Sequence, residues 1–168
     1  CCVTGEFDFG VSLLPDFVRD YESWEAKHMT ESGLFYSIDD RDAMEDSISG
    51  SGLRPTKNGA MYGSACAIAK FAALAGEEDT RLRFEKKAAD LKEKVDSLLW
   101  DGDFYRVIPE CCMEAANRGT FAFSQVPEEH YVREELGYVP WYFDLPDADK
   151  ACAFAQLLTE DGFKAPYG

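Results

Sequence analysis

Residues 58–75 read NGAMYGSACAIAKFAALA, and shortly after them residues 79–99 read DTRLRFEKKAADLKEKVDSLL. The first stretch is apolar on most sides of a helix, which is typical of a helix buried on most sides. In the second, apolar residues recur every three or four positions among charged ones, as in a helix with one face in solvent. Gly76 follows the first stretch as a helix-ending glycine does. The sequence therefore predicts a buried helix paired with a solvent-facing one.

Two further helices are predicted on either side of this pair. One covers residues 14–28, and the other opens at Asp147 and stops at Gly162. The four helices are unequally spaced, whereas a tetratricopeptide-type solenoid would repeat about every 34 residues. Buried and outer helices that alternate with long loops are instead the pattern of an all-α toroid. Two short β-prone pieces, 104–108 and 120–123, are expected to form a hairpin within it.

The long loop from Met29 to Gly59 contains most of the candidate catalytic residues. It is about 30 residues long, and loops of more than about 12 to 15 residues in a compact domain are usually functional. Five carboxylates lie within eight positions of it: Asp39, Asp40, Asp42, Glu45 and Asp46. Crowded carboxylates raise one another's pKa, which can leave one protonated near neutral pH as a general acid. The alternative is a solvated acidic loop surface.

Polar and aromatic residues near this loop are candidates for binding a sugar. Arg54 precedes the buried helix, and Asn58 and Tyr62 lie on its first turns. These three either hydrogen-bond sugar hydroxyls, or Arg54 neutralises the acidic loop. Aromatic residues cluster near the loops and either line a saccharide subsite or belong to the core. They are Trp24, Phe35, Tyr36, Tyr138, Trp141, Tyr142 and Phe143.

Composition and missing motifs exclude several other classes of protein. The net charge of −15 argues against a nucleic-acid partner, which favours a basic surface. No apolar run approaches the roughly 20 residues of a membrane span. The six cysteines form no C-x-x-C pair, and the Asp40-x-Asp42-x-Met44 spacing departs from an EF-hand, so no metal or cofactor is expected. Phosphate-binding loops, dinucleotide fingerprints and nucleophile elbows are absent as well.

Several stretches together resemble the six-hairpin glycosidases related to mannosylglycerate hydrolase and glycoside hydrolase family 63. The stretches are YESWE (21–25), GLFY (33–36), DAMEDSISG (42–50), LRPT (53–56), MYGSA (61–65) and GYVPWYF (137–143). The resemblance spans nearly the whole chain. It implies an (α/α)6 barrel, and a general acid within a stretch of the form Gly-Met-Asp-Asn-Ser, which here reads Ala43-Met44-Glu45-Asp46-Ser47.

Site roles follow from this resemblance. Glu45 takes the acid position, with Asp42 and Asp46 as alternatives, and the mechanism is inverting with a second carboxylate as general base. In the family that base comes late in the barrel, so the resemblance places it beyond Gly168. The resemblance also implies that Trp141 and Tyr142 reach the sugar pocket and that Glu135 lies close to it.

We therefore expect residues 1–168 to be one incomplete catalytic domain of a longer chain, acting on an oligosaccharide or sugar conjugate and inactive alone. One alternative is a toroid of the same ancestry that binds carbohydrate without cleaving it. Another is an all-α interaction module whose acidic loop binds a basic partner. The choice of sugar, the oligomeric state, cysteine pairing and the localisation, whether cytoplasmic or secreted, stay open at this stage.

Overall fold

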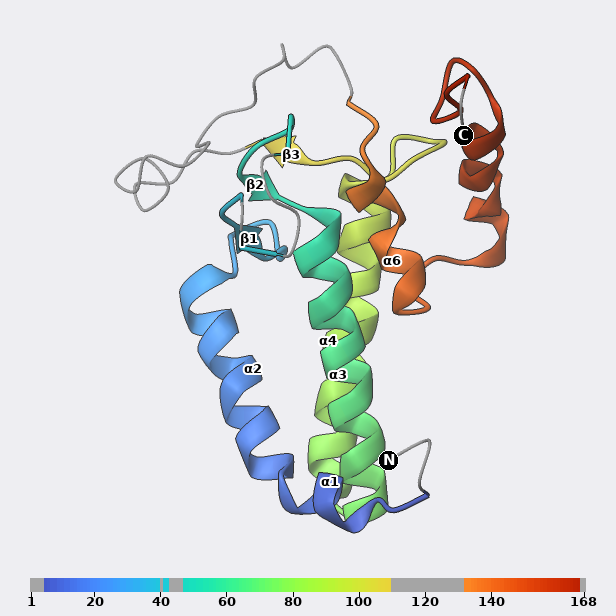
Figure 1. Cartoon of the computed structure of the whole chain (residues 1–168). Helices are drawn as coiled ribbons and strands as arrows, with labels where there is room; N and C mark the ends of the chain where they lie inside the picture. The colour runs from blue at the N-terminus through green and yellow to red at the C-terminus, as the bar shows by residue number, and fades with distance from the viewer. Residues whose placement is uncertain (1–4, 40, 43–46, 110–131, 167–168) are drawn as a thin grey trace.

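The computed structural model describes residues 5–39, 41–42, 47–109 and 132–166. Its centre is an antiparallel pair of long helices, α3 (Pro55–Ala75) and α4 (Glu78–Leu98). Helix α2 (Leu14–His28) packs against α3, and the short α1 (Asp8–Ser12) lies at the far end of the same layer (Figure 1). The chain is thus mainly helical, as expected.

The turn between α3 and α4 depends on one glycine. Gly76 adopts a φ of 75°, a left-handed conformation that glycine reaches at little cost, and its N–H caps the carbonyls of Ala72 and Ala73. Glu78 and Asp79 then open α4, where negative charge complements the helix dipole. The paired helices that residues 58–99 predict are confirmed.

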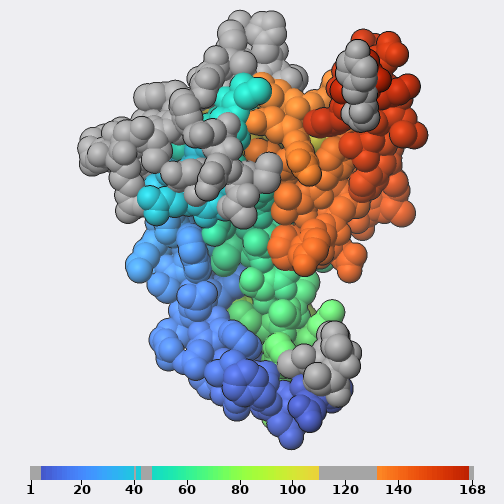
Figure 2. Space-filling view, in the orientation of Figure 1, coloured from blue at the N-terminus to red at the C-terminus, as the bar shows by residue number. Residues whose placement is uncertain are grey.

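Helix α3 is buried along most of its length, whereas α4 buries one stripe. The stripe of α4 consists of Phe84, Ala88, Leu91 and Val95, and the buried apolar residues of α3 are Met61, Ala65, Ile68, Ala69 and Ala72. Tyr21 of α2 joins this core through edge-on contacts with Phe35 and Phe84. In the space-filling view, α3 is visible between α2 and the orange C-terminal segment (Figure 2).

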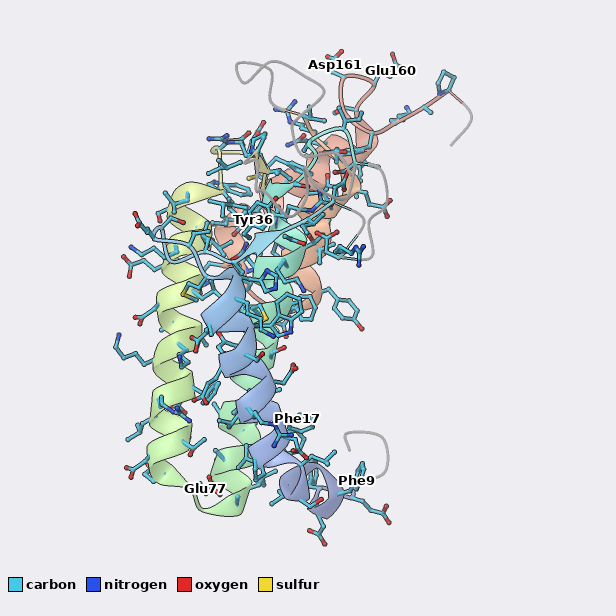
Figure 3. All side chains as sticks on the ribbon, turned by 90° about the vertical axis from the view of Figure 1, so that its left-hand side faces the viewer. Phe9, Phe17, Tyr36, Glu77, Glu160 and Asp161 are labelled. Atoms are coloured by element: carbon cyan, nitrogen blue, oxygen red, sulfur yellow. The ribbon has the colours of Figure 1, made fainter. Side chains whose placement is uncertain are left out.

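A small antiparallel sheet closes one end of the helical layer. Its strands are β1 (Tyr36–Ser37), β2 (Gly52–Leu53) and β3 (Ile108–Pro109), in the order β1-β2-β3. Tyr36 pairs with Leu53, and Leu53 pairs with Ile108. Figure 3 shows Tyr36 at this end of the helices and Glu77 at the other. The sheet therefore holds the acidic loop above the start of α3.

The C-terminal segment covers α3 beside the sheet. It contains a 3-10 turn η1 (Glu135–Tyr138), α6 (Val139–Tyr142) and a 3-10 helix η2 (Ala148–Leu158). Both η1 and α6 contact α3. Within the described ranges, no helix is long and apolar enough to cross a membrane.

Two helices differ in detail from the sequence expectations. Helix α3 begins at Pro55, three residues before Asn58, because proline fits the first helical position. The last helix lies where it is expected, with Asp147 as its N-cap, but it winds as a 3-10 helix and ends at Leu158 instead of continuing towards Gly162. Only Ala153 of η2 is buried, so little packing supports an α-helix. Ile108 pairs with β2. The hairpin partner expected at 120–123 lies outside the described residues.

Candidate functional site

Arg54 is the centre of the acidic loop. It immediately precedes α3 with an extended backbone, and its side chain is 0% exposed. Its Nη1 lies 3.0 Å from Oδ1 of Asp39, and its Nε lies 2.6 Å from Oδ2 of Asp42. Both carboxylates are also buried, at 1% and 2% side-chain exposure. One guanidinium therefore compensates two buried acids of the predicted cluster.

The pair between Arg54 and Asp42 is bidentate. Besides the Nε contact, Nη2 of Arg54 donates to Oδ1 of Asp42 at 3.1 Å. The hydroxyl of Thr56, in the first turn of α3, also donates to Oδ2 of Asp42. A planar guanidinium matches a carboxylate in this geometry. Asp42 is thus anchored to the start of α3 through both of its oxygens.

A second anchor lies at the turn formed by residues 47–50. Arg54 Nη1 donates to the Ser47 hydroxyl and to the Gly50 carbonyl, both at 2.6 Å. Oδ1 of Asp39 accepts from the same Ser47 hydroxyl at 2.9 Å. Gly50 has a φ of 72° and donates its N–H back to the Ser47 carbonyl. Arg54 therefore binds the chain on both sides of residues 43–46.

Glu134 binds the same turn from another direction. Its Oε1 accepts the N–H of Ile48 at 2.7 Å, and its Oε2 accepts the N–H of Ser49 at 3.1 Å as well as the Ser49 hydroxyl. The resemblance had pointed to Glu135, whose side chain is exposed on η1. No motif in the sequence identified Glu134, because its contact with Ser49 joins residues that are 85 positions apart.

Asn58 is fully buried and holds the base of the acidic loop through hydrogen bonds. Its Oδ1 accepts the N–H of Phe35 at 2.8 Å, while its Nδ2 donates to the carbonyls of Phe35 and Arg54. All of these partners are backbone groups of this chain. Asn58 thus fixes β1 against the start of α3, and its amide is fully engaged.

Tyr62 lies one turn further along α3 and faces the groove between α3 and α4. It lines a cavity of about 440 Å³ with Cys66. Burial and the neighbouring Cys66 raise the pKa of Tyr62 to about 12. The structure does not bring Tyr62 into the Arg54 cluster.

The aromatic residues of the C-terminal segment divide into two groups. Trp141 packs edge-on against Trp100 and Tyr105 and belongs to the rim of the core. Tyr142, in contrast, is 85% exposed and contacts Phe143. Of the two predicted sugar contacts, Tyr142 presents its ring to solvent.

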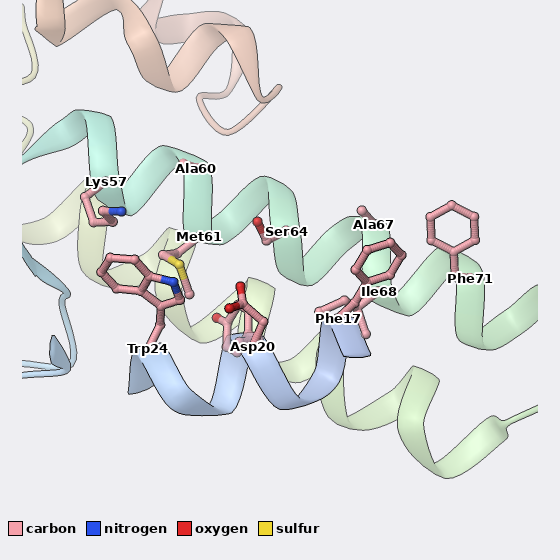
Figure 4. Close-up of a pocket in the computed structure, with 11 residues that line it drawn as sticks. Phe17, Asp20, Trp24, Lys57, Ala60, Met61, Ser64, Ala67, Ile68 and Phe71 are labelled. Carbon is pink, nitrogen blue, oxygen red and sulfur yellow. The ribbon is translucent and has the colours of Figure 1, made fainter. Parts of the chain in front are cut away.

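A second cavity of about 370 Å³ lies between α2 and α3 (Figure 4). Trp24 stands at one end, and the Nζ of Lys57 lies 3.8 Å from the centre of its ring. Burial lowers the pKa of Lys57, against the opposing effect of Asp42 and Asp20. Met61 and Ile68 add an apolar wall. The cavity adjoins the acidic loop through Lys57, which follows Thr56 directly.

Two of the predicted carboxylates, Glu45 and Asp46, lie outside the described residues, as does Asp40. Among the residues that the structure describes, no group of three or more His, Cys, Asp or Glu side chains could hold a metal ion. The described part of the site therefore consists of buried ion pairs and hydrogen bonds between Arg54 and the residues that flank positions 43–46 in the sequence.

Comparisons with known proteins agree with this architecture. The model of the mannosylglycerate hydrolase MGH1-like glycoside hydrolase domain matches residues 2–168. A solved structure titled sialidase superposes with a TM-score of 0.79 at 34% sequence identity. The match covers 98% of this chain and 14% of the sialidase chain, so the chain spans a small part of that protein. The search of curated proteins found no match.

Proposed function

This chain belongs to the MGH1-like glycoside hydrolase domain family, and from that premise we propose that it helps to cleave a glycosidic bond in an oligosaccharide or sugar conjugate. Its helices form part of an (α/α)6 toroid. We assign it an inverting mechanism, in which one carboxylic acid protonates the leaving oxygen and a second carboxylate activates water. The observation that carries the proposal is the family match over nearly the whole chain.

Glu45 is the proposed general acid, and the contacts that Asp42 makes support this choice over Asp42. A general acid must come within hydrogen-bond distance of the leaving oxygen. Both oxygens of Asp42 are bound by Arg54 and Thr56, and its side chain is 2% exposed. In this arrangement Asp42 holds the loop and does not face a substrate. Asp46 is the remaining alternative.

The general base is proposed to lie outside residues 1–168, so these residues alone should not turn over a substrate. The chain matches 14% of the sialidase chain, which is consistent with a site completed by other parts of a protein. One carboxylic acid without its partner base supplies only half of the two-carboxylate mechanism.

Substrate contacts are proposed for Tyr62, Glu135, Trp141 and Tyr142. Arg54 and Asn58 were expected to bind sugar hydroxyls as well, but their polar atoms are buried and bound to this chain. Their contribution to substrate binding is therefore proposed to be indirect, through the loop that they hold. For Arg54 this is the loop-neutralising alternative that the sequence left open.

The test compares wild type with Glu45→Gln in the complete protein that contains this chain. Substrates are mannosylglycerate, sialosides, α-glycosides and oligosaccharides; the exposed Glu160 supplies a matched control, Glu160→Gln. We expect Glu45→Gln to lose about 10² to 10⁴-fold in kcat, as for a missing general acid, and the control to lose nothing. Full activity of Glu45→Gln would place the acid at Asp46 or Asp42. Binding of a glycan without turnover would favour a carbohydrate-binding module. Absence of both binding and turnover would favour an interaction module.

A further inference from the structure

Glu134 makes an unusually complete set of contacts for a glutamate at a segment boundary. Its backbone is extended, with φ −124° and ψ 154°, directly before the η1 turn. Its carboxylate accepts two consecutive backbone N–H groups and one hydroxyl from Ile48 and Ser49. Consecutive backbone N–H groups form a concave site that favours a negative charge. Glu134 therefore fills an anion site that belongs to the acidic loop itself.

The turn at 47–50 is held from two directions. Arg54 binds the Ser47 hydroxyl and the Gly50 carbonyl, while Glu134 binds the N–H groups between them. The Arg54 cation thus binds oxygen acceptors at the two ends of the turn, and the Glu134 anion binds the two N–H donors in its middle. Asp39 also accepts hydrogen bonds from Ser47, and the Gly50 N–H closes the turn on the Ser47 carbonyl. The contacts of Glu134 therefore add to a closed turn, and they are the ones that hold its two middle N–H groups.

This turn begins two residues after Glu45 in the sequence. We propose that Glu134 is a positioning residue for the general acid: it holds the turn at 47–50, which follows the acid segment directly in the sequence. The inference rests on the proposed function, since it needs a general acid in that segment. Glu134 itself contacts neither the substrate nor the reacting atoms in this account.

Leaving-group chemistry separates this role from a merely structural one. An alkyl glycoside, such as a methyl glycoside, needs its leaving oxygen protonated, whereas 2,4-dinitrophenolate departs with little help from an acid. Misplacing the acid therefore slows the first substrate far more than the second. A general loss of folded protein slows both by the same factor, and a lost sugar contact raises KM.

The test uses Glu134→Gln in the complete protein, with the methyl and 2,4-dinitrophenyl glycosides of the sugar that wild type cleaves. Glutamine keeps the shape, but its amide nitrogen cannot accept a hydrogen bond, so the variant loses either the bond from Ile48 or the bonds from Ser49. Ser49→Ala is the second variant, because it removes only the hydroxyl contact and keeps both N–H bonds. Glu160→Gln is the matched control on an exposed site.

We expect Glu134→Gln to lower kcat about tenfold or more on the methyl glycoside and less than about twofold on the dinitrophenyl glycoside, with KM within about twofold. Ser49→Ala should show the same pattern with a smaller loss, so the claim stays testable if the glutamine variant fails to fold. Equal losses on both substrates, or a rise in KM alone, would overturn the proposal.

Glu45→Gln, measured on the same two substrates, distinguishes the two claims. If it shows the leaving-group dependence and Glu134→Gln does not, the positioning role is wrong and the proposed acid stands. If Glu45→Gln is as active as wild type on both, the acid assignment itself fails, and the positioning role fails with it.

Discussion

Arg54 and Asp42 form an ion pair in which neither side chain is more than 2% exposed, with Nε 2.6 Å from Oδ2. Removing two charges from water is costly, and only close geometry with further hydrogen bonds offsets that cost. Here Thr56 and the turn at 47–50 supply those bonds. The pair is therefore a fixed part of the fold, and it anchors the acidic loop to the start of α3.

Substituting Arg54 by methionine should destabilise the domain strongly. Arg54→Met keeps the length of the side chain but leaves Asp39 and Asp42 buried without a cation, a loss of about 3 to 5 kcal/mol for a broken buried pair. The measurement is the thermal melting of the complete protein, followed at the transition of this domain.

Arg19→Met is the matched control for that variant. Arg19 pairs with Asp16 on the surface of α2, where the two side chains are 75% and 53% exposed. Exposed pairs contribute about 0 to 1 kcal/mol. A melting temperature that falls equally in both variants would show that the Arg54 cluster does not hold the loop.

Gly137 should tolerate no side chain. A Cβ at this position would overlap the backbone carbonyl of Tyr105 and the ring of Phe104. At Gly63 the atoms nearest to a Cβ belong to the side-chain ring of Phe143 and not to backbone, and alanine also favours a helix. We expect Gly137→Ala to cost about 1 to 3 kcal/mol or more and Gly63→Ala clearly less. Thermal unfolding measures both, and the reverse order would contradict the packing described for η1.

The raised pKa of Tyr62 predicts that this side chain contributes to a loss of stability at alkaline pH. Burial raises the pKa of Tyr62 to about 12 in the folded chain, against an ordinary value of 10.0 for tyrosine. A raised pKa contributes stability that is complete below pH 10 and is lost as the pH rises towards 12, because the unfolded chain ionises first. Melting temperatures at pH 9 and pH 11.5 should therefore differ less in Tyr62→Phe than in wild type. Tyr142→Phe, at an exposed ring, should behave like wild type; an unchanged difference in Tyr62→Phe would count against this assignment.

The stereochemistry of the product tests the proposed mechanism. A single displacement by water inverts the anomeric centre, whereas a double displacement retains it. Proton NMR of the complete protein with its substrate should show, before mutarotation, the anomer opposite to that of the substrate. A first-formed product with the original configuration would rule out the inverting assignment.

The three long helices α2, α3 and α4 were predictable because each depends on local patterns. Residues 14–28 carry both the apolar period and the charges that match the helix ends, and α2 has those bounds. Gly76 marked the end of α3. The strands were not predictable, because two-residue strands such as β2 are too short to show an alternating pattern. The sequence pattern also did not distinguish a 3-10 helix from an α-helix, as η2 shows.

The location of the buried ion pairs around Arg54 was predictable, whereas their partners were less so. Clustered acids marked the loop, and Arg54 was singled out with two roles left open. The choice between Glu134 and Glu135 depends on which side chain turns toward residue 49, and adjacent glutamates look alike in a sequence. Asp39 was seen only as one acid among five, because its burial against Arg54 is a tertiary contact.

The most direct test of the account is to compare Glu45→Gln and Asp42→Asn in the complete protein, measuring kcat on an unactivated glycoside and the melting temperature of each. We expect Glu45→Gln to lose about 10² to 10⁴-fold in kcat with little change in melting temperature. Asp42→Asn, which weakens the pair with Arg54, should lower the melting temperature and keep most of its kcat at a temperature where it is folded. The opposite result, with Asp42→Asn inactive yet stable and Glu45→Gln fully active, would contradict it.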